Sequence, residues 1–210
     1  MPEFLFPPRP KNKMDPRELP NYEATGKWVV QPKFNGSRNL IHITPERKVV
    51  LWTRHGEHPK TLPFTTSLRD QILSLNLEKG LEYWIDSEAM TKTTTPETKN
   101  KLVLYDVLQA GNYFFNSPDQ MGRLDKLRGI CGNPTALEPW KGIAYVVRPD
   151  IWMTPTWDKD FVKHFKDAYV DDLEGLVLRK KDSVLGSFGN KYYEVSWMIR
   201  CRKPHKNYNL

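Results

Sequence analysis

The chain has 210 residues, enough for one sizeable domain, and 39% of them are hydrophobic, which excludes a disordered basic tail. Lysine and arginine outnumber aspartate and glutamate by 32 to 25, and the resulting net charge of +7 favours a polyanionic partner such as a nucleic acid. The chain has only two cysteines, which predicts no disulfide framework and no zinc site. It has no apolar run of about 18 residues and no signal-peptide pattern, so we expect a cytoplasmic protein without a membrane partner.

Residues 1–25 form a proline-rich basic leader. Six prolines lie between Met1 and Asn21 among basic residues. Proline lacks a backbone donor and disfavours helix in the residue before it. We therefore expect the leader to run extended over the surface without a long helix.

Residues 26–210 alternate short apolar runs with turn signals. Runs rich in Val, Ile, Leu or Trp predict an antiparallel meander of three strands at residues 27–31, 39–44 and 48–53. Further runs of this kind predict strands at residues 81–85, 101–108, 143–147, 175–179 and 193–201. Between two of these strands, residues 91–100 are polar, which predicts an exposed loop that buries little.

Helical periodicity occurs in three segments, which are residues 68–77, 119–130 and 158–169. The first segment follows Thr65, Thr66 and Ser67, any of which is a suitable N-cap. Strands that outnumber helices and follow one another closely predict an α+β fold, with mostly antiparallel sheets flanked by helices.

The sharpest local pattern is a lysine that follows a strand and a proline. Lys33 is followed by Gly36 and by Arg38. Glycine lets the backbone approach a phosphate closely, and the arginine supplies a fixed cationic fork that also disfavours protonation of the lysine. A neutral lysine amine can attack phosphorus. An exposed lysine and arginine beside a glycine turn would show the same short pattern, so this motif needs support from other segments.

Five further segments supply that support. Together with residues 33–38, they resemble the ordered motifs of the covalent nucleotidyltransferases, which include DNA ligases, RNA ligases and mRNA capping enzymes. The segments are Trp52 to Gly56, Ile85 to Ala89, Leu102 to Leu108, Glu174 to Arg179 and Trp197 to Arg202. The resemblance covers residues 27–203 and is strongest to the ATP-grasp-like nucleotidyltransferase (adenylation) domain of polynucleotide ligases. Taken singly, these residues read equally well as core aromatics and surface ion pairs.

The resemblance implies a role for each matched residue. Lys33 would be the nucleophile, Arg54 would help to bind phosphate, Glu88 would contact the ribose and Tyr105 would stack on adenine. The catalytic set would be Lys33, Arg38, Glu174, Arg200 and Arg202. The nucleotide-binding set would be Gln31, Lys33, Arg38, Arg54, Glu88, Tyr105, Arg179, Arg200 and Arg202. Glu174 and Glu88 would hold Mg²⁺ or Mn²⁺.

Some positions depart from the family pattern. Arg200 and Arg202 stand where the family usually has two lysines, Ser87 replaces a glycine, and Asn35 stands where many DNA ligases have aspartate. Alternate residues of a strand point to the same face, so both guanidinium groups can still hold one phosphate chain.

The expected function is an ATP-dependent polynucleotide ligase that joins 5′-phosphate and 3′-hydroxyl ends of nicked DNA or RNA through a lysyl-AMP intermediate. The alternatives are a GTP-dependent mRNA capping guanylyltransferase and a noncatalytic nucleic-acid-binding module. The sequence shows no OB-fold domain after Arg202. We therefore expect the nucleic acid to be held by the leader, by a homodimer or by a separate clamp protein, as in a phage-like minimal ligase.

Overall fold

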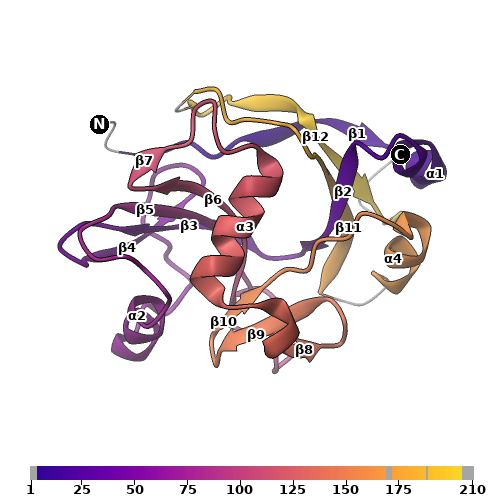
Figure 1. The fold of residues 1–210 in the computed structure, drawn as a ribbon. Coiled ribbons are helices and arrows are strands. Elements are labelled where there is room, and N and C mark those ends of the chain that lie inside the picture. Colours follow the sequence, from indigo (N-terminus) through magenta and orange to yellow (C-terminus); the bar gives the residue numbers. More distant parts are fainter. Residues whose placement is uncertain (1–3, 169–171, 188, 205–210) are drawn as a thin grey trace.

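The computed structural model describes residues 4–168, 172–187 and 189–204. Its centre consists of two sheets (Figure 1). The four-stranded sheet contains, in spatial order, β1 (Arg9–Met14), β12 (Glu194–Arg202), β11 (Leu173–Lys180) and β2 (Trp28–Phe34). The eight-stranded sheet contains, in spatial order, β4 (Val49–Thr53), β3 (Ser37–Ile43), β5 (Tyr83–Ala89), β6 (Leu102–Ala110), β10 (Ile151–Met153), β9 (Ala144–Arg148) and β8 (Glu138–Trp140), and β7 (Asn112–Tyr113) pairs with β6.

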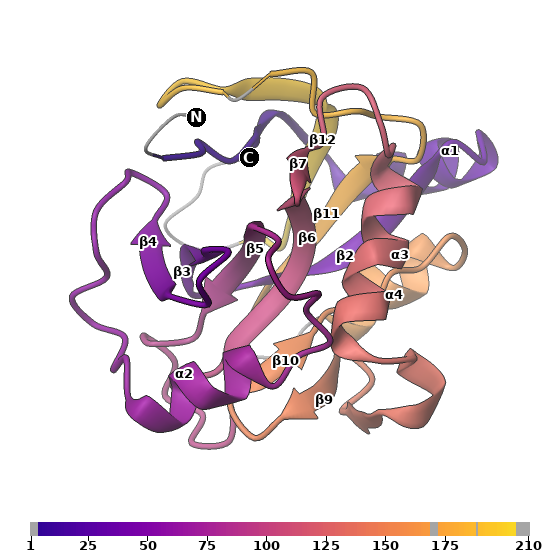
Figure 2. The ribbon, with the colours of Figure 1, turned by 60° about the vertical axis from the view of Figure 1, so that its left-hand side comes forward.

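Four α-helices accompany the sheets within the described residues. They are α1 (Leu19–Ala24), α2 (Thr66–Leu73), α3 (Gln120–Cys131) and α4 (Phe161–Asp167). Figure 2 shows α3 alongside β6, while α1 and α4 lie together beside the four-stranded sheet. Short 3-10 turns occur at Pro16–Glu18 and Pro134–Ala136. The predicted mixture of helices with mostly antiparallel strands is confirmed, because β1/β12 and β10/β6 are the only parallel pairs among the described strands.

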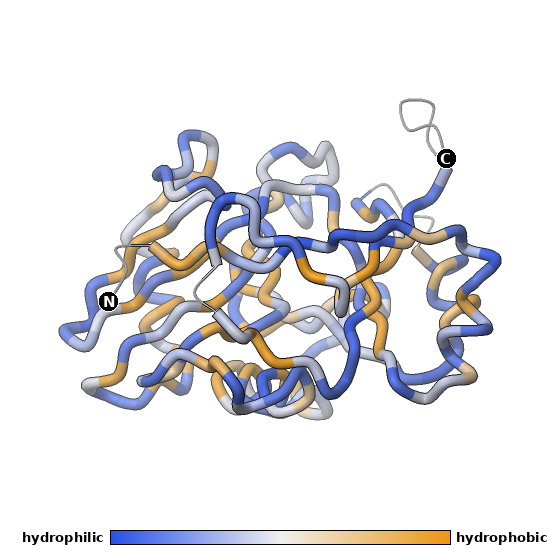
Figure 3. Tube along the Cα trace, turned by 90° about the horizontal axis from the view of Figure 1, so that it is seen from above, coloured by the Kyte–Doolittle hydropathy of each residue, from blue (hydrophilic) through white to orange (hydrophobic). Residues whose placement is uncertain are grey.

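The core consists of two hydrophobic clusters. Ile41, Ile85 and Val107 belong to the cluster of the eight-stranded sheet, whereas Leu176 and Phe161 join the four-stranded sheet to α4. Blue, hydrophilic segments make up much of the outline of the molecule in Figure 3. None of the helices in the described ranges is long and apolar enough to cross a membrane. The second cluster also contains Val103 and Trp152 of the eight-stranded sheet, so it packs the two sheets against each other.

The predicted three-strand meander is wrong. Strand β2 pairs with β11, whereas β3 and β4 pair with each other in the other sheet. Asn35 and Gly36 would suit a tight hairpin, but their backbone N–H groups are used elsewhere. The Asn35 N–H donates to the Asp172 carbonyl at 2.8 Å, and the Gly36 N–H donates to Glu88 Oε1 at 3.2 Å. The chain therefore crosses between sheets directly after Lys33.

The leader is extended, as expected, but it is also part of the fold. Residues Arg9–Met14 form the edge strand β1, parallel to β12, while the side chains of Lys11 and Lys13 are exposed. Met14 and Leu19 are buried. The short helix α1 was not predicted, because Pro20 lies within its six residues; proline is tolerated there since it occupies the first turn.

The other predicted elements correspond to observed ones with shifted ends. Thr65 caps α2 by accepting a hydrogen bond from the Leu68 N–H at 3.1 Å. The third predicted helix is shorter than expected, and its predicted last residue, 169, lies outside the described residues. The loop of residues 91–100 is mostly exposed, yet Thr98 is fully buried. Strands β7, β8 and β10 have two or three residues each, too short for a periodicity to be recognised.

Candidate active site

A cavity of about 480 Å³ lies between the two sheets, at the point where β2 leads into β3. Both sheets contribute to its lining. The residues that line it include all ten candidates identified in the sequence, which are Gln31, Lys33, Arg38, Arg54, Glu88, Tyr105, Glu174, Arg179, Arg200 and Arg202. Residues from six separate segments of the chain therefore meet at one site.

Lys33 is held beside a carboxylate by the pairing of β2 with β11. Its Cα is in register with Gly175, and its Nζ lies 2.7 Å from Glu174 Oε2. Each of these two side chains is 19% exposed. Arg202 Nε lies 2.9 Å from the same carboxylate oxygen. The amine is thus fixed by an ion pair of low solvent exposure, with a second cation next to it.

The turn after Lys33 requires a glycine because β5 approaches it closely. A Cβ at Gly36 would lie 2.5 Å from the Ala89 carbonyl oxygen and 2.9 Å from Glu88 Cγ. No real Cβ tolerates these distances. The same close approach lets the Gly36 N–H donate to the Glu88 carboxylate. The glycine therefore brings the Lys33 turn and Glu88 together, which sequence spacing alone did not show.

Arg38 is anchored rather than free. Its Nε donates to Asp86 Oδ1 at 2.9 Å, its Nη2 pairs with Asp86 Oδ2, and its Nη1 donates to the Pro8 carbonyl at 2.7 Å. Burial acts to lower the pKa of Arg38, but Asp86, Tyr105 and Glu88 together outweigh burial and raise that pKa. The guanidinium is therefore a permanently charged, fixed group in the wall of the cavity.

Two guanidinium groups lie over the ring of Tyr105. The Cζ atoms of Arg38 and Arg179 lie 5.9 Å and 5.4 Å from the centre of its ring. Burial, offset in part by Arg38, raises the pKa of the Tyr105 phenol well above its ordinary value, so the hydroxyl remains protonated at neutral pH. The ring is a neutral, flat wall of the cavity, as a nucleobase platform requires.

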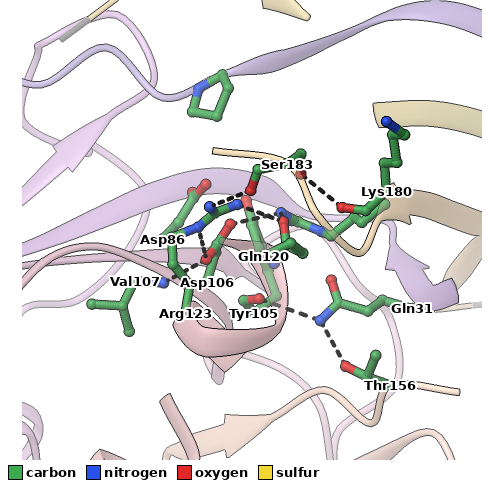
Figure 4. Close-up of polar contacts among 12 residues, drawn as sticks. Gln31, Asp86, Tyr105, Asp106, Val107, Gln120, Arg123, Thr156, Lys180 and Ser183 are labelled. Carbon is green, nitrogen blue, oxygen red and sulfur yellow. Dashed lines mark hydrogen bonds and ion pairs between the residues drawn. The ribbon is translucent and has the colours of Figure 1, made fainter. Parts of the chain in front are cut away.

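A buried ionic network stands behind Tyr105 (Figure 4). Asp106 is fully buried; its Oδ2 accepts a hydrogen bond from Arg179 Nη1 at 2.8 Å, and its Oδ1 accepts one from Arg123 Nε at 3.1 Å. Arg123, on α3, also donates to Gln120 Oε1 at 2.7 Å and to the Ser183 carbonyl at 3.0 Å. Arg179 is only 3% exposed. It therefore faces the cavity from a fixed position.

Gln31 is buried beneath the same wall. Its Nε2 donates to the Tyr105 carbonyl at 3.3 Å and to Thr156 Oγ1 at 3.0 Å (Figure 4). An amide nitrogen has two hydrogens, so these two bonds use its donors. The hydrogen-bonding capacity that Gln31 has left is its carbonyl oxygen, an acceptor.

Glu88 has an unusual protonation equilibrium. Burial raises the pKa of its carboxyl to about 7, although the nearby Lys33 and Arg38 act in the opposite direction. Its Oε1 accepts the Gly36 N–H. The carboxyl is therefore poised between its neutral and charged forms near neutral pH.

The remaining arginines face the cavity with fewer internal partners. Arg200 forms no ion pair with any residue in the described ranges, and its buried Nε has no hydrogen-bond acceptor among them. Burial and the neighbouring Arg202 lower the pKa of Arg200. Arg54, exposed after β4, donates from Nε to His55 Nε2 at 3.0 Å. A half-buried cation whose Nε has no acceptor among the described residues suits an anionic ligand.

Sequence reasoning missed the residues that hold this site in place. Asp86 and Asp106 anchor Arg38 and Arg179, and they are cross-strand neighbours on β5 and β6. Both aspartates lie within recognised segments, so a charged residue inside an apolar run was the available signal. No sequence signal marked Arg123, because it lies in a helix outside every motif. Other lining residues that were not assigned to the site are Arg9, His55 and Lys92.

The charge balance of the cavity favours a polyanion. Eight lysines and arginines line it, against three glutamates. Its volume falls in the range of about 300–1,000 Å³ typical of small-molecule sites. No group of three or more His, Cys, Asp or Glu side chains that would enclose a metal ion occurs in the part of the chain that the structure describes.

Solved structures with a similar fold include DNA ligases. No family profile and no curated protein matches the sequence. The structure named Pmar-Lig_Pre is 15% identical and aligns over 95% of this chain and 46% of its own, with a TM-score of 0.65. The mycobacterial DNA ligase D complexed with ATP and MES is 13% identical over 84% of this chain and 54% of its own, with a TM-score of 0.55. The ATP-dependent DNA ligase from bacteriophage T7, in complex with ATP, is 9% identical over 86% of this chain and 64% of its own, with a TM-score of 0.54.

The chain therefore spans roughly half the length of the first two of these structures, and less than two thirds of the third. At these identities the likeness concerns the fold and not the roles of single residues. The chain has the nucleotidyltransferase fold of ATP-dependent DNA ligases.

Proposed function

We propose that this protein is an ATP-dependent polynucleotide ligase whose Lys33 becomes covalently adenylylated. The observation that carries the proposal is the convergence of all ten candidate residues on one cavity, with Lys33 Nζ held 2.7 Å from Glu174. The likeness of the fold to DNA ligase structures supports a ligase-type enzyme. The narrower ATP-grasp-like description of the fold stays a prediction.

The cavity wall favours adenine as the base. Tyr105 offers a neutral ring for stacking. Gln31 has only an acceptor left for a ligand, because its Nε2 hydrogens are donated to Tyr105 and Thr156. Adenine carries an exocyclic amino donor, whereas guanine carries a carbonyl at the equivalent position. This difference is our reason to propose ATP ahead of the GTP of a capping guanylyltransferase.

In the first step, the Lys33 amine attacks the α-phosphorus of ATP. The new N–P bond forms as the bond from that phosphorus to pyrophosphate breaks. Attack requires a free lone pair on Nζ, so the ammonium has to lose a proton, and Glu174 Oε2 lies within hydrogen-bond distance to accept it. Arg200 and Arg202, on one face of β12, stabilise the charge that develops on the phosphate oxygens.

In the second step, a nucleic-acid 5′-phosphate oxygen attacks the adenylate phosphorus and Lys33 leaves. In the third, a 3′-hydroxyl oxygen attacks the activated 5′-phosphorus, AMP leaves, and a phosphodiester bond remains. Positioning and charge stabilisation carry most of the catalysis. This accounts for a site composed of lysine, arginine and glutamate.

Glu88 and Glu174 are the residues that would hold a divalent cation. Mg²⁺ is commonly bound by one or two carboxylates together with substrate phosphates and water. Two glutamates that line one cavity from different sheets fit this ion, and Mn²⁺ has the same ligand preference. When bound, the ion would neutralise phosphate charge.

The decisive experiment is incubation with labelled ATP and Mg²⁺, followed by denaturing electrophoresis. Covalent label is expected on wild-type protein, and none on Lys33→Ala or Lys33→Arg, because a guanidinium stays protonated and cannot attack. Lys99→Ala, an exposed lysine that does not line the cavity, is the matched control. Label from GTP alone would identify a guanylyltransferase. Absence of label from both nucleotides would leave the noncatalytic nucleic-acid-binding module.

The proposed macromolecular substrate is a nicked duplex. The solved structures with this fold are named as DNA ligases, which favours DNA, and sealing of nicked DNA and nicked RNA by the same preparation would compare the two substrates directly. A homodimer or a separate clamp protein stays a prediction, and so does the cytoplasmic location.

A further inference from the structure

A buried carboxylate outside every recognised motif lies close to the nucleophile turn. Asp172 is only 4% exposed, and its carboxylate forms no ion pair with a lysine or arginine of the described ranges. Two threonine hydroxyls contact it instead. Thr93 donates to Oδ1, and Thr98, which is fully buried, donates to Oδ2 at 3.0 Å. Burying a carboxylate without a counterion costs free energy, which these hydrogen bonds offset only in part.

The backbone of Asp172 holds the nucleophile turn. Its carbonyl accepts the N–H of Asn35, two residues after Lys33, at 2.8 Å. Two residues further along the chain, Glu174 pairs with Lys33 Nζ at 2.7 Å. The register between β2 and β11 is irregular directly after Leu173, so regular strand pairing does not fix this stretch by itself. Asp172 and Glu174 therefore hold the nucleophile together, the first through the backbone of its turn and the second through its amine.

The two threonines connect Asp172 to the opposite sheet. They belong to the loop of residues 91–100, which leads from β5 to β6 in the eight-stranded sheet, whereas Asp172 leads into β11 of the four-stranded sheet. The loop is closed at its base, because the Met90 N–H donates to the Lys101 carbonyl at 2.9 Å. The hydroxyl contacts therefore bridge the two sheets that form the walls of the cavity.

The other side of the nucleophile turn is fastened to the same part of the eight-stranded sheet. The Gly36 N–H donates to Glu88 Oε1 at 3.2 Å, and Glu88 lies near the end of β5, just before the loop begins. The turn is thus held between Glu88 and Asp172. Because the threonine hydroxyls set the spacing between these two supports, their loss would let the supports separate and the Lys33 amine shift.

We propose that Asp172, held by Thr93 and Thr98, is a positioning residue for the adenylylation of Lys33. This inference rests on the proposed ligase function. In the first step, the Lys33 amine has to approach the α-phosphorus in line with the departing pyrophosphate, and a misplacement of about 1 Å can slow such a step about 100-fold. In the third step, Lys33 neither forms nor breaks a bond. Loss of the Asp172 carboxylate therefore slows the first step far more than the third.

The test measures the two steps separately, at a temperature well below the Tm of each variant. Asp172→Ala removes the carboxylate but keeps the backbone carbonyl. It should reduce the single-turnover rate of adenylylation at saturating ATP by about tenfold to 100-fold. The Kd for ATP and the rate of sealing of a pre-adenylylated nick should stay close to the wild-type values.

Threonine variants provide a second perturbation and the controls. Thr98→Val removes one hydroxyl and should show the same step selectivity with a smaller loss, also if Asp172→Ala does not fold. Thr98→Ser retains the hydroxyl and should keep most of the wild-type rate. Thr94→Val, in the same loop but with an exposed side chain that does not line the cavity, should leave both steps unchanged.

Three outcomes would overturn the assignment. Equal slowing of the first and third steps would make the cluster a general support of the fold. A higher Kd for ATP at an unchanged saturated rate would make it a support of the nucleotide pocket alone. Wild-type rates in both Asp172→Ala and Thr98→Val would give it no role. Absence of covalent label on wild-type protein would instead refute the ligase proposal, and this inference with it.

Discussion

Removing the carboxylate of Asp106 should destabilise the protein strongly and selectively. Asp106 is fully buried and pairs with two arginines whose side chains are 0% and 4% exposed. In Asp106→Ala both guanidinium groups lose their counterion while they remain buried. Breaking a buried pair by removing one partner costs about 3–5 kcal/mol. For a protein of about this size, that corresponds to a decrease in Tm of roughly 6–20 °C.

The assay is thermal unfolding followed by circular dichroism, with two comparison proteins. Asp125→Ala removes the partner of Arg128 in an exposed ion pair on the same helix as Arg123, and its Tm should change little. A triple variant with Asp106→Leu, Arg123→Met and Arg179→Met removes the whole ionic group, and it should recover much of the lost stability because no unpaired charge remains.

Activity provides an independent readout of the same network. The Cζ atom of Arg179 lies 5.4 Å from the centre of the Tyr105 ring. Loss of the Asp106 carboxylate that anchors Arg179 should therefore weaken ATP binding in the folded fraction of Asp106→Ala. A Tm of Asp106→Ala within about 2 °C of wild type would refute the reasoning, because it would mean that the two arginines find water or other partners at no cost.

Four other predictions concern the cavity and its approach. Tyr105→Ala should raise the Kd for ATP more than it slows sealing of a pre-adenylylated nick, as measured by titration and by single-turnover ligation, because the stacking face is lost. Gly36→Ala should lower both the Tm and the yield of adenylylated protein, because the new Cβ would lie 2.5 Å from a backbone oxygen. Gly129→Ala is the control: a Cβ there, in α3, meets open space, so the Tm and the yield should stay intact. The pKa of Glu88 is raised to about 7 in the folded protein, so the folded state binds more protons than the unfolded state between pH 4.5 and 7. The free energy of unfolding should therefore fall by up to about 2–3 kcal/mol as pH rises through this window. Denaturant titrations of Glu88→Gln should lack this loss. Lys13, exposed on β1 and in register with Arg200, should contribute to nucleic-acid binding, so Lys13→Gln should reduce the salt slope of a gel-shift titration by about one unit while covalent labelling persists.

The sequence alone selected ten residues that the structure brings to one cavity. Lys33, Glu88, Tyr105 and Glu174 lie in motifs whose spacing reflects local strand geometry, and all of them line the cavity. Local patterns also predicted most strands and helices. These properties depend on residues close together in the chain, which is why they are readable before folding.

Only the tertiary structure decided which strands are neighbours and which residues hold the site in place. The Asn35–Gly36 turn suits a hairpin, yet it crosses between sheets because Asp172 and Glu88 accept its N–H groups. Arg123 reaches Asp106 from a helix that carries no motif. Such contacts join residues far apart in the chain, and their energies depend on burial and on distance in space. Neither quantity exists in the sequence until the sheets have packed.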